Sequence, residues 1–231
     1  MIVIVDYEMG NLRSVQKAFE RIGRAAEVSD KPEVVAKAER LVVPGVGAFG
    51  DAMAALRKRG LVEPIREFSA RGRPMLGICL GLQVFFEESE EVATGAAGDE
   101  CCGTCGGPGS GACAGPAPVE KGLGLVKGRV VKFSPQVTAA GLKVPHMGWN
   151  QVVAARPTPL LAGMPEEGVY FYFAHSYYAS PADDAVVAGR TDYGGRFASA
   201  IASGNIYATQ FHPEKSQAVG LALLENFVTR T

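Results

Sequence analysis

The chain has 231 residues, a length that suits one α/β domain with a sizeable hydrophobic core. It carries 23 basic and 24 acidic residues, and this near balance argues against charge-driven binding to nucleic acid or to anionic membranes. No apolar run approaches the ~18 residues of a membrane span, and the start MIVIVDYEMG lacks the basic leader and cleavage site of a signal peptide. We therefore expect a cytoplasmic protein with reduced cysteines.

The first half of the chain alternates short apolar runs with amphipathic segments. The predicted strands are IVIVDY (2–7), which is typical of a strand buried on both faces, AAEVSD (25–30), RLVVPG (40–45) and PMLGIC (74–79). A first helix carries Leu12, Val15, Phe19 and Ile22 on one stripe, with Asn11 as its cap and Gly23 as its stop. Further helices are expected over Asp51–Arg59, Leu61–Ala70 and Leu80 to about Glu88. Strands that alternate with helices indicate parallel βαβ units.

The second half is richer in strands. Six are predicted: GRVVKF (128–133), WNQVVAA (149–155), VYFYFAHSYYA (169–179), AVVAGRTDY (185–193), FASAIASG (197–204) and NIYATQFHPE (205–214). A final helix over Gln217–Arg230 carries an apolar stripe. We expect one domain over 1–231, with a mostly parallel, doubly wound sheet, helices on both faces and an antiparallel extension.

One segment breaks this pattern. Thr94–Pro118 consists mostly of Gly, Ala, Pro and Cys and has few bulky side chains to bury, so we interpret about 94–118 as a flexible insertion. It holds four of the five cysteines, Cys101, Cys102, Cys105 and Cys113. The CxxC spacing of Cys102 and Cys105 raises the alternative of a zinc site. A structural zinc site usually needs two such pairs, however, and no histidine is near, so no metal and no cofactor is predicted.

The stretch GICLG places Cys79 between Gly77 and Gly81, after an apolar run and before a helical one. A strand, a Gly-x-Cys-x-Gly turn and a helix form a nucleophile elbow. The tight turn strains the backbone of the nucleophile, and side chains at the two glycines would collide with neighbouring backbone. The sulfur also lies at a helix N-terminus, where the dipole favours the thiolate. An ordinary buried cysteine remains the alternative.

A thiolate needs a base, and the chain has three histidines, His146, His175 and His212. In QFHPEKS, Glu214 follows His212 by two positions, and in an extended segment such side chains point the same way. Glu214 can therefore fix the tautomer of the imidazole and stabilise its charged form, as the third member of a triad does. His146 and His175 lack an adjacent carboxylate, which favours packed, hydrogen-bonded histidines.

These residues resemble a known family. GICLG with a distant HPE is the pattern of the triad-type glutamine amidotransferases. More narrowly, VVPGVGAF, GICLGLQVFFEESEE, KVPHMGWN, HSYY and QFHPEKS are together similar to the glutaminase subunits of imidazole glycerol phosphate synthase, from histidine biosynthesis. The resemblance runs from Ile2 to the final helix and leaves out the insertion. PHMGWN beside HPEKS is what selects this group within the superfamily.

The resemblance implies that Cys79 attacks the side-chain amide of glutamine, that His212 shuttles protons and that Glu214 orients His212. The oxyanion hole is expected to use the backbone N–H of Leu80 and, after a peptide flip, that of Val46 in PGVG. The residues implied to bind the α-amino and α-carboxylate groups are Gln83, Glu91 and the backbone of Gly47, Ser176 and Tyr177. A plain turn is the alternative for PGVG, and a solvated helix end is the alternative for Glu91 in EESEE.

PHMGWN implies a partner. Ammonia in bulk water mostly becomes ammonium, so it must pass directly to an acceptor, and Met147 and Trp149 suit an interface anchor. The resemblance implies that this loop meets a (β/α)₈-barrel cyclase subunit, which makes imidazole glycerol phosphate and AICAR, with Asn11, Tyr172 and Lys215 at the same junction. Core packing of Trp149 is the alternative. The chain departs from this family at Glu8 in DYEMGN, where the family has glycine.

Three other functions compete with this one. The chain could serve a different amidotransferase, against which PHMGWN argues. It could be a non-catalytic interaction module, although a dead site has no need of an intact Cys79, His212 and Glu214. A cysteine hydrolase on a related fold would lack the combination of PGVG with HPE and would act without a partner.

Overall fold

The computed structural model describes residues 1–94 and 119–231. All of the predicted insertion except Thr94 lies outside the described residues, and with it Cys101, Cys102, Cys105 and Cys113. The single-domain assignment and the interpretation of the insertion therefore stay predictions. Within the described ranges, no helix is long and apolar enough to cross a membrane.

The larger of two sheets has nine strands in the order β2-β1-β3-β4-β13-β12-β11-β8-β9. Its parallel half comprises β2 (Ala26–Ser29), β1 (Ile2–Val5), β3 (Arg40–Gly45), β4 (Met75–Cys79) and β13 (Ile206–Thr209). Its antiparallel half comprises β12 (Arg196–Ser203), β11 (Val187–Asp192), β8 (His146–Ala154) and β9 (Val169–His175). The predicted parallel sheet with an antiparallel extension is confirmed.

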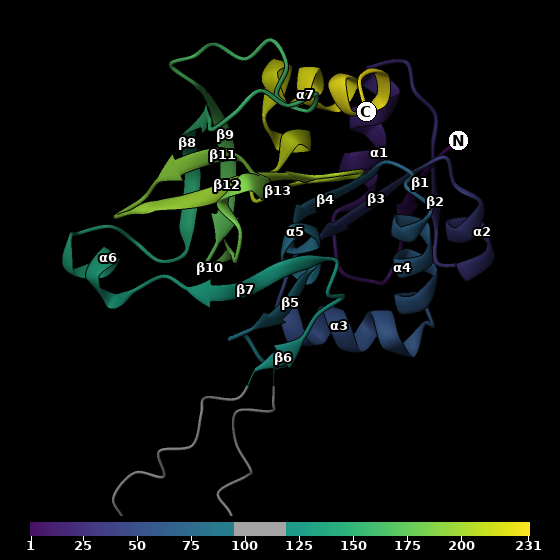
Figure 1. Ribbon diagram of the computed structural model, residues 1–231, viewed down its shortest axis with the longest axis horizontal. Helices are drawn as coiled ribbons and strands as arrows, with labels where there is room; N and C mark the ends of the chain where they lie inside the picture. Colours follow the sequence, from purple (N-terminus) through teal and green to yellow (C-terminus); the bar gives the residue numbers. More distant parts are fainter. Residues whose placement is uncertain (95–118) are drawn as a thin grey trace, which may run out of the picture.

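Helices cover both faces of the parallel half, as predicted (Figure 1). The faces are separated by the alternation of side chains along each strand. Val3 and Leu41 pack in one cluster with residues of α2 (Pro32–Lys37), α3 (Phe49–Lys58) and α4 (Val62–Ala70). Ile4 and Val42 pack on the opposite face with α1 (Leu12–Arg21) and α7 (Gln217–Thr229). Of these helices, the short α2 was not predicted.

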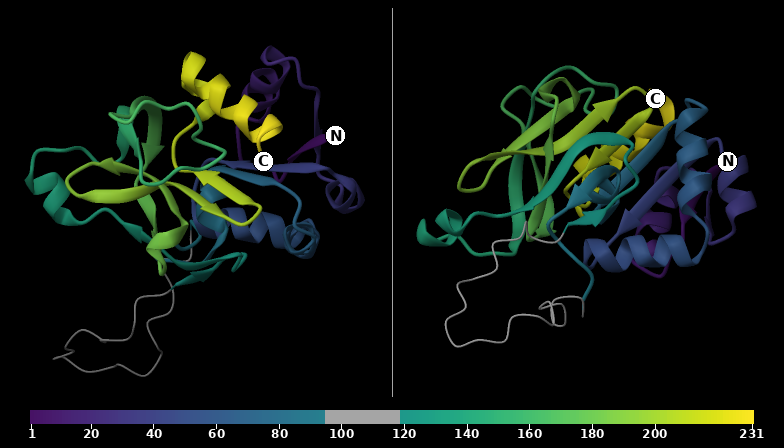
Figure 2. Two further views of the ribbon diagram at one scale, coloured as in Figure 1. Left: turned by 45° about the horizontal axis from the view of Figure 1, so that its top comes forward. Right: turned by 60° about the horizontal axis from the view of Figure 1, so that its bottom comes forward.

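A second sheet, of four strands in the order β10-β7-β5-β6, was not predicted as a separate unit. It contains β10 (Tyr177–Pro181), β7 (Val126–Lys132), β5 (Phe86–Ser89) and β6 (Glu120–Lys121). Figure 2 shows β7, drawn in teal, running alongside β5, with which it pairs in parallel. The predicted strand 169–179 is thus two strands, since the chain leaves the large sheet at Ser176 and enters the small one at Tyr177.

The helix expected from Leu80 to about Glu88 was also wrong, because α5 (Leu80–Val84) ends after five residues. The adjacent Phe85 and Phe86 are both fully buried. From Phe86 onward the chain pairs with β7 and β6 instead. EESEE is therefore not a helix end, and Glu91 follows a strand. The short helices α6 (Pro135–Ala139), η1 (Asp184–Val186) and η2 (Pro213–Lys215) complete the fold.

Candidate active site

The turn between β4 and α5 holds Cys79 at φ 54° and ψ −106°, a conformation that side-chain-bearing residues rarely adopt. The flanking glycines are required sterically. A Cβ on Gly81 would lie 1.7 Å from the carbonyl oxygen of Val43, and one on Gly77 would lie 2.7 Å from that of Gly81. The geometry of this strand–turn–helix is therefore that of the predicted elbow.

A cavity of about 200 Å³ opens beside Cys79. Its lining includes eight of the predicted catalytic, oxyanion and substrate-binding residues, which are Val46, Gly47, Cys79, Leu80, Gln83, Glu91, Ser176 and Tyr177. They come from both sheets and from loops far apart in the sequence. A larger cavity, of about 690 Å³, lies along 154–166, where the lining has no cysteine and no histidine. The chemistry of the side chains, and not cavity size, singles out the cavity at Cys79.

His212 and Glu214 form a buried pair after β13. His212 Nδ1 lies 2.8 Å from Glu214 Oε1, and the two side chains are 2% and 3% exposed. Burial alone would lower the pKa of His212, but the Cys79 thiolate and Glu214 outweigh burial and raise this pKa to about 10. His212 Nε2 is buried and has no hydrogen-bond partner within the described residues. Cys79, His212 and Glu214 therefore lie close together.

Gln83 and Glu91 approach the cavity in different ways. Gln83 is buried, and its Nε2 donates to the carbonyl oxygen of Tyr177 at 2.9 Å. Glu91 Oε2 accepts from the backbone N–H of Phe49 at 3.0 Å. Partial burial raises the pKa of Glu91. Glu91 is therefore a positioned carboxylate at the cavity wall and not a solvated helix end.

Comparison with known proteins agrees with this geometry. The family model for class-I glutamine amidotransferases matches residues 3–231. The chain belongs to this family. "Imidazole glycerol phosphate synthase subunit HisH" of Syntrophotalea carbinolica is 50% identical over 229 residues, covering 98% of each chain. The HisH subunit of Rhodopirellula baltica is 48% identical, covering 99% of this chain and 97% of its own. At this level of identity the amidotransferase belongs with the HisH subunits.

Solved structures agree on the fold. A chain described as glutamine amidotransferase superposes with a TM-score of 0.67 at 19% identity, covering 99% of this amidotransferase and all of the other chain. A chain of PurLQS from Thermotoga maritima has the same TM-score at 18% identity, covering 99% and 97% of the two chains.

The loop after β3 carries the second predicted oxyanion element of the amidotransferase. Val46 is exposed, and Gly47 has a φ of 107°, in the region that favours glycine. A Cβ on Gly47 would lie 2.8 Å from Met9 Cε. The backbone conformation of this loop therefore depends on glycine at position 47.

Sequence reasoning missed a chain of hydrogen bonds behind the cavity of the amidotransferase. The backbone N–H of Gln151 donates to Asn150 Oδ1 at 2.8 Å, so Asn150 Nδ2 faces His146 Nε2 at 3.2 Å. His146 Nδ1 lies 3.0 Å from His175 Nε2, and His175 Nδ1 lies 2.8 Å from the carbonyl oxygen of Tyr177. Because an amide nitrogen only donates and a carbonyl only accepts, both histidines must be neutral and protonated on Nδ1. Burial agrees, since it lowers the pKa of His146 to about 4 and that of His175 to about 3.

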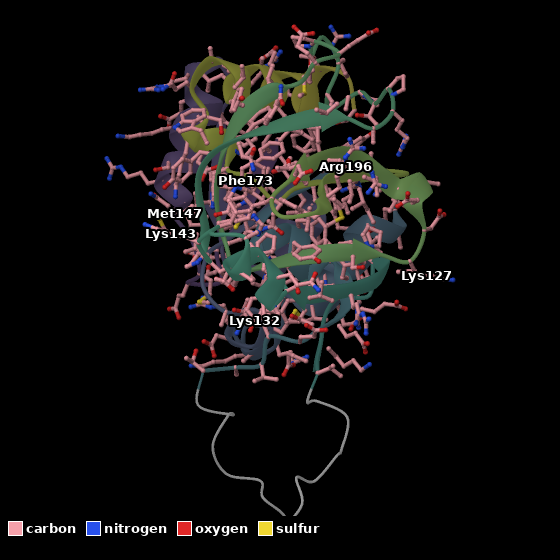
Figure 3. All side chains as sticks on the ribbon, turned by 90° about the vertical axis from the view of Figure 1, so that its left-hand side faces the viewer. Lys127, Lys132, Lys143, Met147, Phe173 and Arg196 are labelled. Atoms are coloured by element: carbon pink, nitrogen blue, oxygen red, sulfur yellow. The ribbon has the colours of Figure 1, made fainter. Side chains whose placement is uncertain are left out.

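Four of the predicted interface residues of the amidotransferase lie together on the outer face of β8, β9 and η2. Met147 and Trp149 are 67% and 47% exposed, so Trp149 is not a core residue. Trp149 meets Tyr172 edge to face at 6.2 Å, and Lys215 Nζ lies 5.8 Å from the centre of the Tyr172 ring. Figure 3 shows Met147 near the edge of the molecule in that view, whereas Phe173 is fully buried. Asn11 instead caps α1, which contacts η2, and accepts from the N–H of Ser14 at 3.2 Å.

Within the described residues, no group of three or more histidine, cysteine, aspartate or glutamate side chains could hold a metal ion. The four cysteines of the insertion lie outside this range. The predicted absence of a metal therefore stays a prediction.

Proposed function

We propose that this chain hydrolyses glutamine to glutamate and ammonia at Cys79 and passes the ammonia to the cyclase subunit of imidazole glycerol phosphate synthase. One observation carries the proposal: the strained cysteine of the elbow shares a buried site with the His212–Glu214 pair. The relatives named HisH subunits support this synthase over other amidotransferases. The chain is proposed to work in the cytoplasm, where its thiol stays reduced.

The first half-reaction makes a thioester. The Cys79 sulfur attacks the side-chain carbonyl carbon of glutamine, and an S–C bond forms. The C–N bond breaks as protonated His212 gives its proton to the leaving nitrogen, and ammonia departs. The raised pKa of His212 suits this step, because it keeps the ring protonated at neutral pH while the thiolate is present.

The second half-reaction returns the thiolate. Neutral His212 takes a proton from water, the resulting hydroxide attacks the thioester carbon, and the C–S bond breaks. The electron pair returns to sulfur, glutamic acid leaves and ionises, and His212 is again protonated beside Glu214. The buried Glu214 carboxylate holds the ring on the same nitrogen throughout, since it bonds Nδ1 and leaves Nε2 for the reacting groups.

The negative oxygen of each tetrahedral intermediate needs donors. The N–H of Leu80, next to the nucleophile at the start of α5, is one proposed donor. The N–H of Val46 is the other, after the peptide between Gly45 and Val46 flips. Gln83, Glu91 and the backbone of Gly47, Ser176 and Tyr177 are proposed to bind the amino-acid end of glutamine. Their place in the lining of one cavity supports this assignment.

The surface of Met147, Trp149, Tyr172 and Lys215 is proposed as the contact with the (β/α)₈-barrel cyclase, with Asn11 at its rim. Large exposed apolar side chains beside a cation are typical of interface anchors. Met147 also lines the cavity at Cys79, so the proposed interface and the site of ammonia release adjoin. Within the heterodimer, the cyclase uses ammonia to make imidazole glycerol phosphate and AICAR.

The nucleophile is tested with an electrophilic glutamine analogue. Mass spectrometry of the cyclase complex should find the label on Cys79, and Cys79→Ser should lose both labelling and glutamine-dependent product formation. Supplied ammonia should still support the cyclase in the Cys79→Ser complex, because only the glutaminase step is removed. Labelling chiefly of Cys101, Cys102, Cys105 or Cys113 would overturn the assignment.

A further inference from the structure

Gln210 contacts the sulfur of Cys79. Gln210 Nε2 lies 3.7 Å from Cys79 Sγ, within hydrogen-bond distance for sulfur, and the Gln210 side chain is fully buried. The sheet explains this contact. In the parallel pairing of β4 with β13, Ile78 lies opposite Thr209. One position further along, the same pairing brings Gln210 beside Cys79.

The orientation of the Gln210 amide follows from its neighbours. Gln83 Nε2 donates to the carbonyl oxygen of Tyr177 at 2.9 Å, and this oxygen can only accept. The same nitrogen of Gln83 lies 3.2 Å from Gln210 Oε1. Gln210 therefore presents its oxygen to Gln83 and its NH₂ group to the sulfur. The neutral histidine chain adds a second donor, His175 Nδ1, to the same Tyr177 oxygen and so helps to hold this arrangement.

An N–H donor and a carbonyl oxygen act oppositely on the sulfur. The carbonyl oxygen of Ala174, 3.8 Å from Sγ, can bond only the protonated thiol. The Gln210 N–H can bond the thiolate and gains strength when the sulfur is charged. Other titratable groups near the pair are Tyr7, His175, His212 and Glu214, with Glu91 in the wall of the same cavity. Burial keeps Tyr7 and His175 neutral, so His212 is the cation and Gln210 the neutral donor.

We propose that Gln210 is a further catalytic residue of the glutaminase reaction, which donates a hydrogen bond to the Cys79 thiolate before attack and again when the thioester is cleaved. This role rests on the proposed function. It also predicts a property that can be measured without glutamine, the reactivity of the thiolate itself.

Gln210→Glu is the sharpest test, because a carboxylate can keep the bond from Gln83 while replacing the NH₂ group with oxygen. In the cyclase complex, kcat for glutamine should fall about 10- to 100-fold with little change in KM, which corresponds to one lost charge-assisted hydrogen bond. The pH for half-maximal alkylation of Cys79 by iodoacetamide, followed by mass spectrometry of the Cys79 peptide, should rise by about one pH unit or more. Gln210→Met, which lacks both charge and donor, should shift the alkylation profile in the same direction.

Gln16→Glu is the matched control. Gln16 also donates through Nε2, to the carbonyl oxygen of Ala26, but it lies on α1 and does not line the cavity at Cys79. The pH profile of Cys79 alkylation in this variant should therefore match that of the wild type. Wild-type alkylation profiles in both Gln210 variants, with thermal unfolding showing that each is folded, would overturn the inference. If the wild-type complex does not hydrolyse glutamine but the Gln210 variants still shift the alkylation profile, the proposed function is contradicted and the hydrogen bond from Gln210 to the thiolate is supported.

Discussion

The three histidines of the chain have very different proton affinities although all are buried. The lowered pKa values of His146 and His175 mean that their contribution to stability is present above pH 6.5 and is lost as pH falls towards 4 and 3. At His212 the sign is reversed. Its contribution is full below pH 6.5 and is lost as pH rises through about 10.

Nitrogen-15 NMR of histidine-labelled protein tests these assignments, because only three imidazoles contribute. From pH 5.5 to 8.5 we expect two neutral rings protonated on Nδ1 and one imidazolium, which disappears in His212→Gln. The free energy of unfolding should also fall between pH 6.5 and 4. Neutral rings protonated on Nε2 at His146 or His175 would contradict the hydrogen-bond chain.

Glu8 has a φ of 66°, in the region that favours glycine, and its exposed carboxylate pairs with Arg59 at 2.5 Å. Left-handed backbone costs a side-chain-bearing residue about 1–2 kcal/mol, the added freedom of glycine in the unfolded chain costs about 0.5–1, and an exposed ion pair contributes little. Glu8→Gly should therefore stabilise the protein by about 0.5–1 kcal/mol in urea unfolding. Glu8→Ala keeps the strain and should not stabilise; equal gains in both variants would refute strain as the cause.

At the scale of elements, Asn150 and His146 on β8 connect to His175 at the end of β9 and to Tyr177 at the start of β10. Asn150→Asp reverses the first bond, because a carboxylate only accepts and His146 Nε2 would then need a hydrogen. The change should raise KM for glutamine up to about tenfold by disturbing the Tyr177 backbone, with a smaller effect on kcat.

Asn226→Asp is the matched control for this prediction. Asn150 Nδ2 donates to a second acceptor, the carbonyl oxygen of Asp192. Asn226 Nδ2 likewise donates to two acceptors, the carbonyl oxygens of Leu160 and Ala162, and neither of these residues lines the cavity at Cys79. The control should lose stability and keep its KM. An unchanged KM in Asn150→Asp would show that the histidine chain does not position the substrate site.

Sequence reasoning predicted best where the deciding interactions are local. The elbow follows from the glycines beside Cys79. The His212–Glu214 contact was predicted from a spacing of two residues in an extended segment, and the contact forms although the strand ends at Thr209 and Pro213–Lys215 is the 3-10 helix η2. The short α5 was missed because its end depends on pairing with β7, a strand some forty positions away. The contact of Gln210 with Cys79 was missed for the same reason, since it depends on the register of β13 beside β4. Pairing between distant segments is not encoded in the pattern of one segment.

In the molecule as a whole, the strands before and after the predicted insertion, β5 and β6, lie side by side. Glu120 of β6 pairs with Ser89 of β5, so a short linker can join the strands on either side of the predicted insertion. Replacing 95–118 by a few glycines should change the free energy of unfolding by less than about 1 kcal/mol, because the segment offers little apolar surface to a core. Thermal unfolding and soluble yield measure this. Insoluble protein, or stoichiometric zinc in the unaltered chain, would contradict the interpretation as an insertion without a metal.

We propose that binding of the cyclase turns the peptide between Gly45 and Val46, so that glutamine is hydrolysed rapidly at Cys79 only in the complex. The most direct measurement is the rate of glutamate formation by the free chain, by its complex with the cyclase, and by the complex with the nucleotide ligand of the cyclase. Because one oxyanion donor contributes on the order of 10²–10³ in rate, the liganded complex should exceed the free chain by about that factor. Equal rates in all three states would contradict the claim and indicate an autonomous hydrolase.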